Sequence, residues 1–163
     1  MKRNDLIDQD TFSLSRLILE KKISPVELVK AQLIGIEEEN PDINAIVTLS
    51  AESALQSARK AEKQLMKQQI AGPLHGIPFL VKDLFDTADI RTTYGSIYFK
   101  DHVPVRDAFI VKKLKSAGGI LLGKTNTSEF GFSHLSSNKL YGSTKNPWNT
   151  ACTPGGSSGG NGA

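Results

Sequence analysis

The residues best suited to chemistry lie in a glycine-rich segment with two adjacent hydroxyl groups. Within residues 154–163 (PGGSSGGNGA), Ser157 and Ser158 stand between two pairs of glycines. Glycine is common where the backbone must turn sharply or approach another group closely, because it has no Cβ. Ordering such a loop costs conformational entropy, so a folded protein keeps one where the backbone has a function. The composition alone is equally typical of a flexible linker or terminus.

The second candidate is Lys82, which ends a short apolar run. Turn residues open the stretch 72–83 (GPLHGIPFLVKD), and its apolar residues 79–81 stop abruptly at Lys82. A lysine at the end of a strand usually reaches the surface, because lysine is seldom fully buried. Burial would instead lower the pKa of its amine and make it a usable base.

Together these stretches resemble the amidase signature family. Each motif is weak by itself, but all occur in the family's order, with Ser157 lying 75 positions after Lys82. The resemblance covers nearly the whole chain and is carried by residues 24–28 (SPVEL), 40–45 (NPDINA), 72–83 (GPLHGIPFLVKD), 123–130 (GKTNTSEF), 146–149 (NPWN) and 154–160 (PGGSSGG). It implies an α/β chain: the N-terminal part of the amidase signature fold, with a mixed sheet covered by helices.

The resemblance also implies an enzyme with a Ser–cis-Ser–Lys triad, which hydrolyses a carboxylic amide to an acid and ammonia or an amine. Lys82 matches the family's lysine, which must be neutral to act as a base. Ser157 matches the bridging serine, joined to the preceding glycine by a cis peptide bond, and Ser158 would support the same network. Gly131 and Phe132 align with a stretch that lines the acyl pocket. Neither a metal nor a cofactor is implied.

One element of the family's pattern falls outside these residues. The nucleophilic serine lies on a later glycine-rich loop (typically D-x-G-G-S), which also supplies the oxyanion-hole amides, and the sequence ends at Ala163 before such a loop. We therefore expect 1–163 to be a single incomplete amidase domain, inactive alone, with 1–70 mostly helical and 71–163 beginning the α/β catalytic core. We also expect residues 155–163 to be poorly fixed.

Two other functions stay open. The A subunit of the tRNA-dependent glutamine amidotransferase uses the same triad, although residues 130–134 and the Asn161-Gly162 pair look more like those of stand-alone amidases. A non-catalytic binding module that keeps the first part of the fold is the third. The expected partners are a small-molecule amide of unspecified class and either a second copy or a C-terminal portion.

Composition excludes several other classes. With 39% hydrophobic and 23% charged residues, the 163-residue chain is typical of one soluble globular domain. A net charge of +3 is too small to indicate direct nucleic-acid binding, and no apolar run approaches the length of a membrane span. A single cysteine, Cys152, permits no internal disulfide, so we expect a cytoplasmic protein.

The elements that must position the site follow from periodicity. Helical spacing predicts helices at 12–22, 24–40, 51–69 and 108–117, the second beginning with a Ser24–Glu27 capping box and ending at Asn40-Pro41. Residues 45–49, 79–82 and 120–122 are predicted strands, and their alternation with helices predicts parallel pairing.

Two motifs are better explained without a ligand. Residues 118–125 (GGILLGKT) fit the written P-loop pattern, but the variable positions form an apolar strand instead of following one. We therefore predict no nucleotide site there. His75 lies among turn residues, so we expect it to form structural hydrogen bonds.

Overall fold

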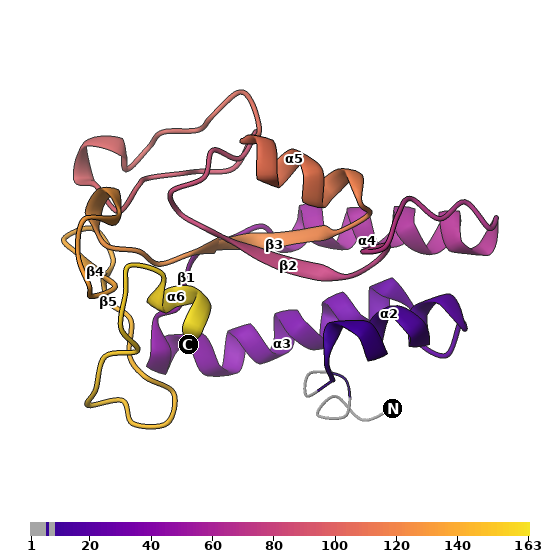
Figure 1. Cartoon of the computed structure of the whole chain (residues 1–163), viewed down its shortest axis with the longest axis horizontal. Coiled ribbons are helices and arrows are strands. Elements are labelled where there is room, and N and C mark those ends of the chain that lie inside the picture. The colour runs from indigo at the N-terminus through magenta and orange to yellow at the C-terminus, as the bar shows by residue number, and fades with distance from the viewer. Residues whose placement is uncertain (1–5, 7–8) are drawn as a thin grey trace. The chain divides into compact units, whose positions relative to one another are not determined.

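The computed structural model describes Leu6 and residues 9–163, which form both helices and strands (Figure 1). The chain forms two compact units and passes between them several times. The first unit comprises the described residues through Ile36, together with Ser50–Phe79 and Lys112–Leu122. The second comprises Glu37–Leu49, Leu80–Val111 and Gly123–Ala163. The expected single incomplete domain remains a prediction.

The predicted elements are all present, with changed ends. The helices are α2 (Thr11–Leu19), α3 (Pro25–Ile43), α4 (Ala51–Met66), α5 (Phe109–Ser116) and α6 (Gly159–Gly162), with 3-10 turns at Ile97–Phe99 and Glu129–Gly131. The strands are β1 (Ile46–Leu49), β2 (Pro78–Lys82), β3 (Ile120–Thr125), β4 (Ser137–Asn138) and β5 (Gly142–Ser143). None of the described helices is long and apolar enough to cross a bilayer.

The helix α3 begins as predicted and ends later than predicted. The Ser24 hydroxyl accepts from the Glu27 amide at 3.0 Å, and the Glu27 carboxylate accepts from the Ser24 amide at 2.8 Å, which completes the capping box. Pro41 does not stop the helix, which continues to Ile43. Only two helical residues follow Pro41, so its missing N–H removes one hydrogen bond from the last turn without ending the helix at that residue. The Asn40 side chain closes this end by accepting from the amides of Ala45 and Ile46.

The main sheet is mixed, with strand order β1–β3–β2. β2 and β3 run parallel, since Ile120 N donates to Ile77 O at one end and Asp83 N donates to Thr125 O at the other. β1 is antiparallel to β3, so the expectation of parallel pairing is wrong for this pair. Alternation of strands and helices predicts direction only for strands joined through one helix, whereas two helices and β2 separate β1 from β3.

The first unit has an apolar core, and the buried His75 forms hydrogen bonds within the same unit. His75 is buried; its Nδ1 accepts from Ala71 N at 3.2 Å, and its Nε2 lies 3.0 Å from Ala61 O. The structural role predicted for it is therefore present. The buried apolar cluster of this unit contains Leu6, Leu14, Ile18, Ile23, Leu28, Ala31, Leu65 and Ile77.

The second unit buries mostly polar side chains, which makes its interior dependent on hydrogen bonds. Its buried polar and charged residues include Asp83, Thr87, Thr92, Thr93, Ser96, Lys124, Thr125, Asn126, Thr127, Ser128, Ser136 and Thr144. A buried polar group without a partner costs free energy, so each of these side chains constrains its neighbours. This unit also contains every candidate site residue.

Candidate active site

Lys82 is the last residue of β2, and its amine lies on the two candidate serines. Its Nζ is 2.7 Å from Ser157 Oγ and 2.8 Å from Ser158 Oγ, so residues 75 positions apart in the sequence share one hydrogen-bond network. The side chain is partly buried, and this desolvation lowers the pKa of the amine below its ordinary value of 10.5. A neutral amine can therefore form at lower pH than on an exposed lysine.

Glycines shape the segment that presents the two serines. The peptide bond between Gly156 and Ser157 is cis, as the resemblance implied, and Gly155 has a φ of +86°. A Cβ on Gly156 would lie only 2.5 Å from the Leu135 carbonyl carbon, which no side chain permits. The backbone thus passes against residue 135 at the point where Ser157 is presented, and only glycine fits this approach.

The end of the segment is anchored within the second unit, unlike the poorly fixed tail that we expected. Gly159 N donates to Ser136 Oγ at 2.5 Å, and Thr125 Oγ1 donates to Asn161 Oδ1 at 2.6 Å. Gly160 packs so closely on Asn126 that a Cβ would overlap its backbone. The anchors therefore lie within the chain itself, which the sequence pattern did not reveal.

Of the two predicted pocket residues, the structure brings Gly131 to the serines. A Cβ at Gly131 would lie 3.7 Å from Ser157 Oγ and 2.8 Å from a Leu84 methyl group, so its absence leaves space beside the hydroxyl. The φ of +73° at Gly131 also favours glycine. Phe132 follows directly, but its side chain is 95% exposed. The acyl-pocket role of both residues stays a prediction.

Sequence reasoning missed two charged residues behind the site, Asp83 and Lys124. Both are fully buried, and Lys124 Nζ lies 3.7 Å from Asp83 Oδ1. Burial raises the pKa of Asp83, while the hydrogen bond from Thr93 and the positive charges of Lys124 and Arg91 oppose that rise. Both residues fall inside the family-like motifs, but nothing in their spacing pairs them. Lys124 donates inside the protein, to Phe85 O and Thr92 Oγ1.

Sequence reasoning also missed an aromatic cluster, formed by Tyr94, Phe99 and Phe130. The Tyr94 hydroxyl donates to Asp86 Oδ1 at 2.6 Å, and its ring packs against Phe99 and Phe130 at centroid distances of 5.1 and 6.3 Å. Burial and the Asp86 carboxylate raise the pKa of Tyr94 to about 12, so the hydroxyl keeps its proton. Phe130 N donates to Tyr94 O at 2.8 Å, which links this cluster to the 3-10 turn that contains Gly131.

Comparison with known proteins agrees with this arrangement. The family model described as Amidase matches residues 27–163. The chain belongs to the amidase signature family. The chain is 45% identical over 154 residues to the A subunit of the glutamyl-tRNA(Gln) amidotransferase of Desulfosudis oleivorans. This match covers 94% of this chain and 32% of that protein.

Solved amidase structures share the fold as well. A bacterial aryl acylamidase of the amidase signature family superposes with a TM-score of 0.90 at 33% identity, covering 93% of this chain and 32% of that one. The native peptide amidase from Stenotrophomonas maltophilia superposes with a TM-score of 0.86 at 31% identity, covering 94% and 33%. The chain thus spans about a third of the length of its amidase-signature relatives.

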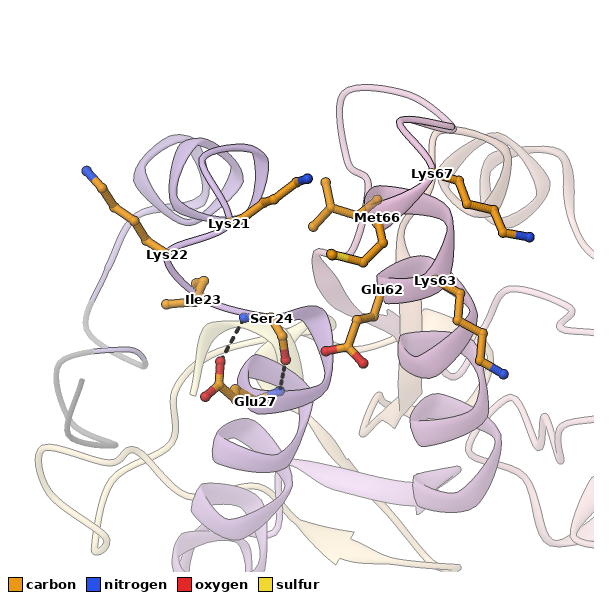
Figure 2. A pocket seen from close by; sticks show the side chains of 10 residues that line it. Lys21, Lys22, Ile23, Ser24, Glu27, Glu62, Lys63, Met66 and Lys67 are labelled. Carbon is orange, nitrogen blue, oxygen red and sulfur yellow. Dashed lines mark hydrogen bonds between the residues drawn. The ribbon is translucent and has the colours of Figure 1, made fainter.

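A separate hollow of about 510 Å³ lies in the first unit of this amidase-signature chain. Ile23 and Leu65 contribute apolar surface, and Figure 2 shows Lys22 and Lys67 pointing away from it. The one hydroxyl among its lining residues, Ser24, is held in the capping box (Figure 2). The lining of this hollow thus brings no lysine–serine hydrogen bond like that of Lys82 and Ser157 among the described residues.

Proposed function

We propose that this chain provides the lysine and the bridging serine of an amidase that hydrolyses a carboxylic amide to an acid and ammonia or an amine. The observation that carries the proposal is the contact of a desolvated Lys82 amine with Ser157 Oγ at 2.7 Å. A neutral lysine is a competent general base, and serine attack on an acyl group requires such a base.

Ser157 and Ser158 have different roles in this proposal. A neutral amine has one lone pair and two N–H donors. It can therefore accept the Ser157 proton while it donates to Ser158, which lies 2.8 Å away. Ser158 then orients the amine, and Ser157 stands between the base and the attacking group.

The proposed reaction uses a further serine, supplied from outside residues 1–163, as the nucleophile. Its proton passes to Ser157 Oγ while the Ser157 proton passes to Lys82, and the serine oxygen bonds to the amide carbon. The tetrahedral intermediate collapses, the C–N bond breaks, and the proton returns through Ser157 to the leaving nitrogen. Water then cleaves the acyl-enzyme along the same route and regenerates the serine. Gly131 and Phe132 would contact the acyl group.

A second candidate is the glutamine-cleaving component of an amidotransferase. The D. oleivorans relative carries the amidotransferase name and is 45% identical to this chain, against 33% for the aryl acylamidase structure. In this case the amide would be that of glutamine, and further subunits would be the partners. Both candidates require the same role for Lys82.

The test is a chimera in which this chain is followed by the remaining two thirds of the aryl acylamidase. Hydrolysis of aryl, aliphatic and peptide amides and of glutamine would be measured for wild type, Lys82→Ala and the control Lys139→Ala, which changes an exposed lysine. We expect Lys82→Ala to lower kcat by roughly 10³-fold or more, because loss of a triad member leaves only residual catalysis. An unchanged kcat in Lys82→Ala, or a folded chimera inactive on every amide, would refute the proposal. Preference for glutamine would favour the amidotransferase.

A further inference from the structure

Asp83, the residue after Lys82, is fixed by backbone and side-chain hydrogen bonds. Its N–H donates to Thr125 O, and its carbonyl accepts from Tyr94 N, both at 3.0 Å. Its carboxylate Oδ2 accepts from Thr93 N at 3.1 Å and from Thr93 Oγ1 at 2.5 Å. Oδ1 has no hydrogen-bond partner among the described residues and lies 3.7 Å from Lys124 Nζ.

Lys124 uses its amine to hold the loop that follows Asp83. Its Nζ donates to Phe85 O at 2.6 Å, to Thr92 Oγ1 at 2.8 Å and to Thr87 Oγ1 at 3.1 Å. An ammonium group has three donors, so these acceptors occupy all of them. The acceptors come from both ends of residues 83–93, and Lys124 itself lies in β3. One buried cation therefore ties this loop and the carboxylate of Asp83 to the neighbouring strand.

Stability alone gives no strong reason for this arrangement. Burying two charges costs desolvation free energy that their attraction often fails to recover, so a buried ion pair is weak evidence of stabilisation. Its geometric effect is more direct. Asp83 directly follows the last residue of β2, and its N–H still donates to Thr125 O, so fixing Asp83 also fixes the backbone from which the Lys82 side chain leaves. The long, flexible Lys82 side chain reaches Ser157 only if its backbone is held.

We propose that the Asp83–Lys124 pair positions the end of β2 so that the Lys82 amine stays on the hydroxyls of Ser157 and Ser158. Both residues are positioning residues, because they touch the base only through the backbone. The inference rests on the proposed function of Lys82 as the base and extends it to the residues that hold that base in place.

If the Asp83–Lys124 pair acted on Lys82 only through its charges, Asp83→Asn would change the pKa of Lys82 in the opposite direction from a loss of positioning. Asp83→Asn leaves the positive charge of Lys124 uncompensated, and a nearby like charge disfavours the protonated amine, so it would lower the pKa of Lys82 further. Loss of positioning instead lets the amine reach water, and the pKa rises toward 10.5. The other charged groups around this loop, Arg91 and Asp86, are unchanged in the variant, so they affect the pKa of Lys82 equally in wild type and in Asp83→Asn.

The experiment is an NMR titration of the lysine side chains in the 163-residue chain, labelled with ¹³C-lysine and with Lys82 assigned through Lys82→Arg. Wild type would be compared with Asp83→Asn and with Thr93→Val, a milder variant that removes the hydroxyl bonded to Asp83 and to Gly95 N. The matched control is Asn138→Ala, which breaks bonds to Asn126 Oδ1 and Thr127 O and touches neither member of the pair.

We expect the pKa of Lys82 to rise by about 1 pH unit or more in Asp83→Asn, and by a smaller amount in Thr93→Val, as its amine becomes hydrated. Asn138→Ala should leave it unchanged even where it lowers the melting temperature. A lower or unchanged pKa of Lys82 in folded Asp83→Asn or Thr93→Val, or an equal rise in Asn138→Ala, would overturn the inference. The experiment measures the pKa of the Lys82 amine and not amide hydrolysis, so the inference can fail or hold independently of the proposed function.

Discussion

Replacing Lys124 with methionine should destabilise the chain far more than a lysine substitution ordinarily does. Methionine keeps most of the length and apolar volume of the side chain but removes the charge and all three hydrogen bonds to Phe85, Thr87 and Thr92. It also leaves the Asp83 carboxylate buried without its cation. Removing one partner of a buried ion pair costs about 3–5 kcal/mol. That is a large share of the roughly 5–15 kcal/mol by which a domain is stable.

The assay is urea unfolding followed by circular dichroism, with Lys139→Met as the control at an exposed lysine. We expect the control to change the free energy of unfolding by no more than about 0.5 kcal/mol, as is usual for surface positions. Adding Asp83→Asn to Lys124→Met should recover part of the loss, since the double variant no longer buries an unpaired carboxylate. A loss below about 1 kcal/mol in Lys124→Met would refute the reasoning, because an uncompensated buried charge should cost more. Simple additivity in the double variant would show that the two charges do not interact.

Three further predictions concern the site itself. Gly156→Ala should break the contact of Lys82 with Ser157, because the added Cβ would meet the Leu135 backbone. The control is Gly162→Ala, whose added Cβ would meet open space. Both variants would be followed in the lysine NMR spectrum, and an unchanged Lys82 signal in Gly156→Ala would contradict the close approach of the backbones. Because burial lowers the pKa of Lys82, the folded chain loses this proton first, so the free energy of unfolding should rise with pH from that lowered pKa up to 10.5. Lys82→Met should flatten this rise in urea titrations, and an identical slope would contradict it. The purified 163 residues alone should hydrolyse no amide at a useful rate, because the family's nucleophile and oxyanion donors are not among them. Mass spectrometry of a panel of amides would measure this. Hydrolysis by the wild-type residues that disappears in Lys82→Ala would contradict the prediction.

Local patterns predicted the local structure well. The Ser24–Glu27 capping box could be recognised because all its partners lie within one helical turn. Pro41 shows the limit of the same reasoning, since the helix continues for two residues past it although the proline cannot donate the hydrogen bond of that position. Sequence gives the residue type, but the cost depends on its position in the finished helix.

Long-range pairs could not be predicted from pattern. Ser157 lies 75 positions from Lys82, and only the resemblance to a family brought them together before the structure did. Asp83 and Lys124 were missed for a different reason: charged residues usually face water, so an ion pair inside the fold contradicts the rule by which sequences are read. Likewise, the anchor of Gly159 on Ser136 depends on a backbone approach that composition does not encode.

The two lysines on the adjacent strands β2 and β3 show how surroundings decide the chemistry of one residue type. Lys124 meets a carbonyl, two hydroxyls and a carboxylate, so its amine is directed at groups that accept hydrogen bonds and hold the loop after Asp83. Lys82 meets two serine hydroxyls, each of which can also donate, and its partial burial disfavours the charge. A hydroxyl serves either protonation state of the amine, so Lys82 can lose and regain a proton without losing its partners. The two lysines therefore differ in what their amines contact: Lys124 holds the loop after Asp83, and Lys82 lies beside the hydroxyl with which we propose that it exchanges a proton.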